Sequence, residues 1–225
     1  MSLTLYGAIL SPFVRKSRIQ LMEQGLEYEL VSIDPFNQPD WYADINPLRR
    51  VPALKTADGI FADSAIIAQY LHENLPGGNL YGSTPAEAAQ VRWLEKFADY
   101  ELAPLATFTV FRNRLLNPLH GKPCDEAAVS DAMEHGLPPL LAYLEQHLEG
   151  RHWFLGEQFS LADIAVGSQL INMAHGGQLI DELQWPNLSS LLSKLSSRHS
   201  VSALLPGEHQ LVGKLRELAA KRQIH

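Results

Sequence analysis

Residues 3–33 have the sequence LTLYGAILSPFVRKSRIQLMEQGLEYELVSI. The first four of these residues suit a short strand. Ser11-Pro12 then marks a helix start, because a serine oxygen can cap free backbone N–H groups and proline in the first turn needs no partner for its nitrogen. The helical pattern runs to Gly25, and Tyr28 to Ile33 is a second β-rich run. The stretch therefore predicts a β-α-β unit with two parallel strands.

The next segment completes a small mixed domain. Residues 34–50 carry three prolines and predict a long, irregular connection. A hairpin is predicted over residues 53–62 around the Asp58-Gly59 turn, and a helix from Asp63-Ser64 to about Asn74. These elements predict an α+β domain of the form βαβ-ββα.

The second part of the chain is expected to be all-helical. The breaker-rich stretch PGGNLYGSTP at residues 76–85 separates the two parts. Helical patterns follow at about residues 86–116, 125–149, 161–174, 188–198 and 208–222. We expect one domain over residues 1–78, a linker over 79–85 and a second domain over 86–225.

Composition narrows the possible functions. The chain has 225 residues, 46% of them apolar, which indicates a packed globule. Its net charge of -7 opposes a nucleic-acid partner. No apolar run approaches the roughly 20 residues that cross a membrane, and the opening residues lack the charge order of a signal peptide. We therefore expect a cytoplasmic protein that neither associates with a membrane nor binds nucleic acid. The nine histidines show no spacing typical of a metal site.

Four separated motifs point to a known family. They are Ser11-Pro12-Phe13-Val14, Asn46-Pro47-Leu48-Arg49-Arg50-Val51-Pro52-Ala53-Leu54, Asp63-Ser64, and Ser160-Leu161-Ala162-Asp163. In this order the chain resembles the cytosolic glutathione transferase family, in particular its serine-type, bacterial or plant tau-like classes. The resemblance covers essentially the whole chain. It implies a thioredoxin-like domain followed by an all-α domain that forms much of the electrophile pocket.

The resemblance implies glutathione as co-substrate, with no metal. Attack on an electrophile requires the thiolate, and a thiol with a pKa of about 8.5 is mostly protonated at neutral pH. We expect Ser11 to donate a hydrogen bond to the glutathione sulfur. Two alternatives stay open: Ser11 only caps its helix, or Tyr6 is the donor, as in the tyrosine-type classes.

The same resemblance assigns residues that hold glutathione. Asp63 and Ser64, at a helix start, are expected to bind the γ-glutamyl end. A cis peptide bond between Val51 and Pro52 would present the backbone of Val51 to the cysteinyl part, and Arg50 is expected to meet the glycyl carboxylate. Family members carry glycine where this chain has Arg49, so the local backbone conformation stays open.

The second-substrate pocket is expected between the first loop and the first long helix of the second domain. Such an apolar stripe is also typical of a helix core. The candidates are Leu10, Phe13, Phe108, Phe111, Arg112 and Leu115.

Other charged and polar groups are expected to be structural. Ser160 and Asp163 are predicted to cap a buried helix reciprocally. Arg15, Lys16 and Arg18 are predicted to form a solvated helix face.

The expected function is conjugation of glutathione to a hydrophobic electrophile by a homodimer, a detoxification reaction. Glutathione-dependent peroxidase or isomerase activity stays open, since either can use the same thiolate. Dithiol exchange is disfavoured, because Ser11 and Val14 stand where related thioredoxin-like proteins carry cysteines. The alternative class is a non-catalytic interaction protein similar to the stringent starvation proteins.

Overall fold

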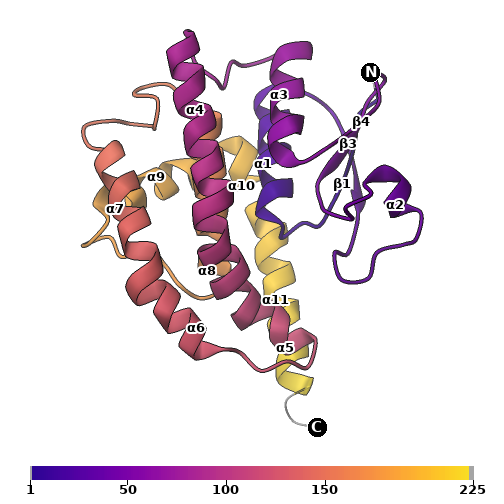
Figure 1. The fold of residues 1–225 in the computed structure, drawn as a ribbon, viewed down its shortest axis with the longest axis vertical. Helices are drawn as coiled ribbons and strands as arrows, with labels where there is room; N and C mark the ends of the chain where they lie inside the picture. Colours follow the sequence, from indigo (N-terminus) through magenta and orange to yellow (C-terminus); the bar gives the residue numbers. More distant parts are fainter. Residues whose placement is uncertain (1, 223–225) are drawn as a thin grey trace.

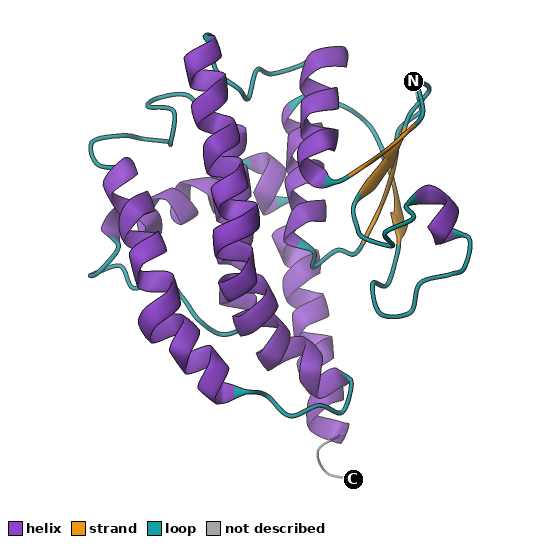
Figure 2. Ribbon diagram, viewed as in Figure 1, coloured by secondary structure: helices purple, strands orange, loops and turns teal. Residues whose placement is uncertain are grey.

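A computed structural model describes residues 2–222 of the chain as a small sheet beside a larger helical assembly (Figures 1 and 2). The sheet has the strand order β2-β1-β3-β4, with β1 parallel to β2 and antiparallel to β3. The strands are β1 (Thr4–Gly7), β2 (Glu29–Ser32), β3 (Ala53–Lys55) and β4 (Ile60–Ala62). The predicted β-α-β unit and hairpin are confirmed.

Three helices accompany the sheet: α1 (Pro12–Glu23), α2 (Tyr42–Ile45) and α3 (Ser64–Asn74). Figure 1 shows α1 and α3 between the sheet and the helical assembly, and α2 at the outer edge. The short helix α2 lies in the connection predicted to be irregular. One turn of helix between Pro39 and Pro47 is too short to produce a periodic pattern.

The rest of the described chain is helical, as predicted. Its elements are α4 (Pro85–Phe97), η1 (Ala98–Leu116), α5 (Asn117–Leu119), α6 (Glu126–Asp131), η2 (Ala132–Gly136), α7 (Leu137–His147), α8 (Leu161–His175), α9 (Pro186–Ser197), α10 (His199–Ser202) and α11 (Leu205–Arg222). The ends of the two expected domains, residue 1 and residues 223–225, lie outside the described residues.

The predicted helix over residues 86–116 consists of α4 continued by η1, in which the turns widen to the π type. Pro104 lies inside η1 and has no N–H to donate to the helical ladder. The Thr109 hydroxyl donates to the Pro104 carbonyl at 2.8 Å. Proline and such a hydroxyl contact both disturb regular α-helical hydrogen bonding at this point of η1.

Helix α8 begins at the predicted capping box. The Ser160 N–H donates to the Asp163 carboxylate at 2.8 Å, and the Phe154 N–H donates to its other oxygen at 2.9 Å. Ser160 and Phe154 are buried as well, so their N–H groups would otherwise lack partners. The box therefore fixes both the start of α8 and the loop before it.

Helix α1 joins two apolar cores. Val14 and Leu21 pack into the sheet core, whereas Ile19 belongs to the helical core. The sheet approaches α1 very closely: a Cβ on Gly7 would lie 2.4 Å from a methyl group of Val14. Only glycine fits at this point of β1.

The prediction that Arg15 and Lys16 are solvated is wrong. Arg15 is fully buried and donates to Glu208 of α11 at 2.9 Å, and Lys16 donates to Glu95 of α4 at 2.8 Å. Both charges stay buried because carboxylates from the helical assembly pair with them. Arg18 is half-buried and donates to the Tyr28 hydroxyl at 3.0 Å.

Candidate functional site

Three of the sequence motifs meet at one edge of the sheet. Tyr6 of β1 pairs with Ala53 of β3, and Ala53 pairs with Ala62 of β4. Because both pairings are antiparallel, the end of β1, the start of β3 and the end of β4 lie together. This register brings the turn at Ser11, the bond at Val51-Pro52 and the pair Asp63-Ser64 to the same edge.

Ser11 caps helix α1. Its Oγ accepts a hydrogen bond from the Val14 N–H at 3.4 Å, and its own N–H donates to the Ala8 carbonyl at 3.0 Å. The side chain is half-buried. A hydroxyl has one hydrogen to donate besides its acceptor lone pairs, so capping does not use the Ser11 hydrogen. Ser11 can cap the helix and donate to a ligand at the same time.

Asp63 and Ser64 open helix α3. The Asp63 carboxylate accepts from the Ala65 N–H at 2.8 Å, and Asp63 has a φ of 78°. A positive φ is uncommon for a residue with a side chain, and such conformations concentrate at ligand sites. Asp63 is exposed, whereas Ser64 is buried. The starts of α1 and α3 thus both lie at this edge, where helix dipoles favour an anionic ligand.

The Val51–Pro52 peptide bond is cis, as the resemblance implied. The Arg50 carbonyl before it accepts from the Tyr42 hydroxyl at 2.9 Å and from the Asn46 amide at 2.8 Å, while its side chain is exposed. Arg49 has a φ of 52°. Arg49 therefore adopts a left-handed conformation, which glycine accommodates readily. The backbone conformation at this position is thus one that suits the glycine that family members carry here.

Tyr6 lies on the other face of the sheet. Leu5 and Gly7 face α1, so the side chain of Tyr6 between them points away from that helix. Its ring packs against Trp41 and Tyr42, with centroids 6.1 and 6.3 Å away. The contacts of Tyr6 are therefore with the α2 region.

The six second-substrate candidates separate into two groups. Leu10, Phe111 and Leu115 are buried and pack together with Val212 of α11. Phe13, Phe108 and Arg112 are partly or largely exposed. The rings of Phe13 and Phe108 stack with centroids 6.2 Å apart, and Phe108 is 50% exposed. This stacked pair bridges α1 and η1.

Neighbours from two further segments were missed by sequence reasoning. Phe36, in the connection after β2, packs against His120 with ring centroids 4.5 Å apart, and the Arg112 guanidinium lies 5.9 Å from the Phe36 ring. Leu211 and Leu215 of α11 pack against the buried group. The apolar face of α11 is visible in the sequence, but its position beside Leu10 depends on the tertiary fold.

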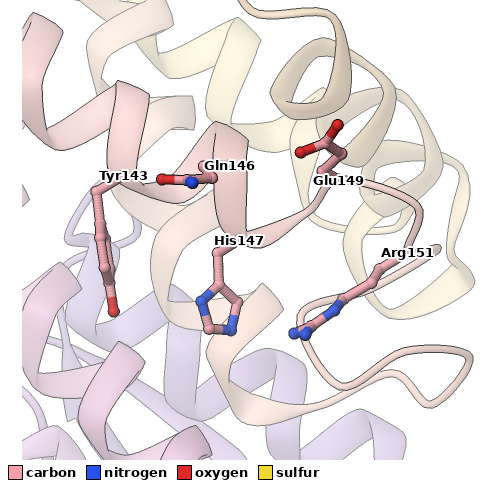
Figure 3. A pocket seen from close by; sticks show the side chains of 5 residues that line it. All are labelled: Tyr143, Gln146, His147, Glu149 and Arg151. Atoms are coloured by element: carbon pink, nitrogen blue, oxygen red, sulfur yellow. The ribbon is translucent and has the colours of Figure 1, made fainter.

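A separate open depression of about 400 Å³ lies at the end of α7 (Figure 3). Figure 1 places α7 on the opposite side of the helical assembly from the sheet. The Gln90 amide lies 2.7 Å from His147 Nε2, and burial together with the charge of Arg151 lowers the pKa of His147. The lining residues are Tyr143, Gln146, His147, Glu149 and Arg151. None of them belongs to the motifs at the sheet edge.

Residues 2–222 contain no group of three or more His, Cys, Asp or Glu side chains arranged to hold a metal ion. In the same range, no helix combines the length and apolar character needed to cross a bilayer.

Known proteins resemble this chain along most of its length. Residues 5–79 match the family described as Glutathione S-transferase, N-terminal domain, and residues 111–206 match Glutathione S-transferase, C-terminal domain. Glutathione S-transferase 3 of Zea mays is 34% identical over 167 residues, covering 72% of this chain and 73% of its own. Glutathione S-transferase U1 of Arabidopsis thaliana is 26% identical over 225 residues, covering 97% of this chain and 95% of its own.

A solved structure extends the similarity to three dimensions. The glutathione S-transferase of Methylobacillus flagellatus KT, solved with glutathione bound, has a TM-score of 0.76 and 28% identity, covering 90% of this chain and 98% of its own. With both halves of the chain matched, and with a relative that is 34% identical over 73% of its length, the chain belongs to the glutathione S-transferase family.

Proposed function

We propose that this enzyme conjugates glutathione, the co-substrate of its family, to a hydrophobic electrophile, and that Ser11 donates a hydrogen bond to the thiolate. One observation carries the proposal: the Ser11 Oγ accepts from the Val14 N–H, which leaves the hydroxyl hydrogen for a ligand at the helix start. Tyr6, the alternative donor, packs its ring against Trp41 and Tyr42 on the far side of the sheet.

The energies are of the right size for this role. Lowering a thiol pKa by about 2 units requires about 2.7 kcal/mol of preferential stabilisation of the anion. One hydrogen bond to a charged acceptor supplies about 1.5–3 kcal/mol, and a helix N-terminus about 0.3–1 kcal/mol. A single hydroxyl at the start of α1 can therefore supply most of this stabilisation, and no histidine base is needed.

Glutathione binding is proposed at the sheet edge. Asp63 and Ser64 would hold the γ-glutamyl end at the start of α3, the backbone of Val51 before Pro52 would pair with the cysteinyl part, and Arg50 would meet the glycyl carboxylate. In this proposal residues 1–78 form the glutathione-binding domain, residues 79–85 the linker and residues 86–225 the helical domain.

The electrophile is proposed to bind where Phe13 and Phe108 stack, since aromatic rings provide an apolar platform beside Ser11. Arg112 would border this platform, and Leu10, Phe111 and Leu115 would support it from below. A cytoplasmic location belongs to the same proposal, because glutathione is kept reduced there.

The test begins with titration calorimetry of glutathione and of S-methylglutathione. We expect both to bind and only glutathione to react with a chloro-nitroaromatic acceptor, with a rate that rises with pH as the bound thiol ionises. A hydroperoxide and a cis-trans isomerisable diacid, assayed on the same sample, separate peroxidase and isomerase activity from conjugation. Absence of glutathione binding would overturn the proposal and favour a non-catalytic interaction protein.

We further propose a homodimer in which the sheet side of each copy meets the helical side of the other. Such a contact needs apolar surface on both sides. On the helical side, Trp93 of α4 is 56% exposed and Tyr100 of η1 is 63% exposed. The sheet side exposes Ile60 of β4 and Ile66 of α3, at 41% and 52%.

A charge placed on the aromatic side should break this dimer. The chain has a mass of 25.1 kDa, so we expect light scattering to give twice that mass for the parent protein and 25.1 kDa for Trp93→Glu. Leu183→Glu is the matched control, because Leu183 is 90% exposed in the loop after α8 and should leave the dimer intact. A parent protein that is monomeric at micromolar concentration contradicts the proposal.

A further inference from the structure

The peptide bond before Ser11 is anchored by a side chain from the far end of α8. The Asn172 amide nitrogen donates to the Leu10 carbonyl at 3.1 Å, and both groups are buried. The same peptide unit donates through the Ser11 N–H to the Ala8 carbonyl at 3.0 Å. The plane of this peptide bond is thus held on both sides, and Ser11 Cα and its side chain project directly from it.

The orientation of the Asn172 amide is fixed by Arg15. Its oxygen accepts from Arg15 at 2.9 Å, which leaves its nitrogen to face Leu10. Arg15 also donates to the Ser168 carbonyl at 2.8 Å and binds Glu208 through two guanidinium nitrogens. A guanidinium with this many partners has one allowed position.

Glu208 completes the chain of contacts on α11. It lies 2.9 Å from His175 Nε2, one turn beyond Asn172 on α8. Burial works against the charge of Glu208, but the guanidinium of Arg15 and the bond from His175 outweigh it and hold its pKa below the ordinary range. Glu208 is therefore ionised at neutral pH, as a firm anchor for Arg15 requires.

We propose that Asn172 is a positioning residue for thiol activation: by holding the Leu10 carbonyl it sets the place of the Ser11 hydroxyl, and Arg15 with Glu208 sets the place of Asn172. The inference rests on the proposed role of Ser11. A hydrogen bond to a thiolate weakens steeply with misalignment, and donors that are fixed in advance need no reorganisation during the reaction. Asn172 is fully buried, so in this proposal its effect on the thiol passes through the Ser11 turn.

The test uses Asn172→Leu, which removes both hydrogen bonds at nearly constant volume. The pKa of bound glutathione is read from the ultraviolet absorbance of its thiolate across pH. We expect that pKa to rise by about 1 unit and kcat/KM for a chloro-nitroaromatic at neutral pH to fall about 10-fold. The Kd for glutathione should stay within about threefold, because a positioning role acts on the ionised sulfur.

Gln169→Leu is the matched control. Gln169 is the neighbouring buried amide on α8, and its oxygen accepts from the Thr107 hydroxyl of η1 at 2.6 Å. The Gln169→Leu variant should lower the melting temperature about as much as Asn172→Leu and leave the pKa of bound glutathione unchanged. Asn172→Ala, whose smaller side chain avoids any clash, should raise the thiol pKa as Asn172→Leu does.

The double variant Ser11→Ala with Asn172→Leu separates this inference from the proposed function. If Asn172 acts through Ser11, adding Asn172→Leu to Ser11→Ala should not raise the thiol pKa further. The positioning role is overturned if the thiol pKa in both Asn172 variants equals that in the parent protein, or if Asn172→Leu raises it equally with and without Ser11. The role of Ser11 then stands. If the thiol pKa in the single variant Ser11→Ala equals that in the parent protein, both the positioning role of Asn172 and the role of Ser11 are overturned.

Discussion

Ser11→Ala is expected to lower kcat/KM for a chloro-nitroaromatic about 100-fold at neutral pH and to move the onset of activity to higher pH. The reason is that alanine lacks the hydroxyl hydrogen that the proposed thiolate bond needs. Alanine also loses the capping bond from the Val14 N–H, which should cost about 0.5–2 kcal/mol of stability without preventing α1 from forming. Glutathione affinity should change only a few-fold, since the contacts proposed for Asp63, Ser64 and Val51 are untouched. A pH profile of kcat/KM together with calorimetry measures both quantities.

The matched control for this change is Ser17→Ala. Ser17 is a buried serine on the same helix, and its hydroxyl donates to the Phe13 carbonyl at 3.3 Å, within the helix. The Ser17→Ala variant should have the same pH profile of kcat/KM as the parent protein. Kinetics of Ser11→Ala equal to those of the parent would remove Ser11 from catalysis.

Arg15→Leu is expected to lower the free energy of unfolding by about 3–5 kcal/mol, because it leaves the carboxylate of Glu208 buried without its main cation. Both side chains are fully buried in the parent protein. Urea denaturation followed by circular dichroism measures the change.

Two comparisons sharpen this expectation. Arg114→Leu removes the ion pair with Glu126, whose carboxylate is 59% exposed. This variant should lower the free energy of unfolding by less than about 1 kcal/mol. The double variant Arg15→Leu with Glu208→Leu should recover part of the loss, since no unpaired charge then stays buried. An Arg15→Leu protein within about 1 kcal/mol of the parent would contradict the view that Arg15 is the cation on which the buried charge of Glu208 depends.

The parts of the fold that depend on near neighbours were predictable from the sequence. Ser11-Pro12 and Asp63 start their helices within three residues of the groups they cap, and Asp58-Gly59 turns its hairpin locally. The capping box at Asp163 follows the same rule. Such signals are complete within a few residues, so tertiary packing is not needed to interpret them.

The buried charges of α1 were not predictable in the same way. Arg15 and Glu208 are 193 residues apart in the sequence, and a basic run on a helix is usually solvated. A weaker signal does exist in α8, a helix buried along nearly its whole length, where Ser168, Asn172 and His175 recur every three to four residues. Polar side chains at that spacing in an apolar helix indicate an internal polar partner. They do not say which one.

The sharing of helix α1 between two cores bears on how such a chain can be recombined. Transplanting residues 2–74 onto the helical part of a relative would carry Arg15 and Lys16 into an interface where Glu208, Glu95 and Asn172 are replaced by whatever the relative has there. Each unmatched charge would then destabilise the hybrid by several kcal/mol. The two halves are therefore not interchangeable modules, and viable chimeras are expected only between parents that share both sides of these contacts.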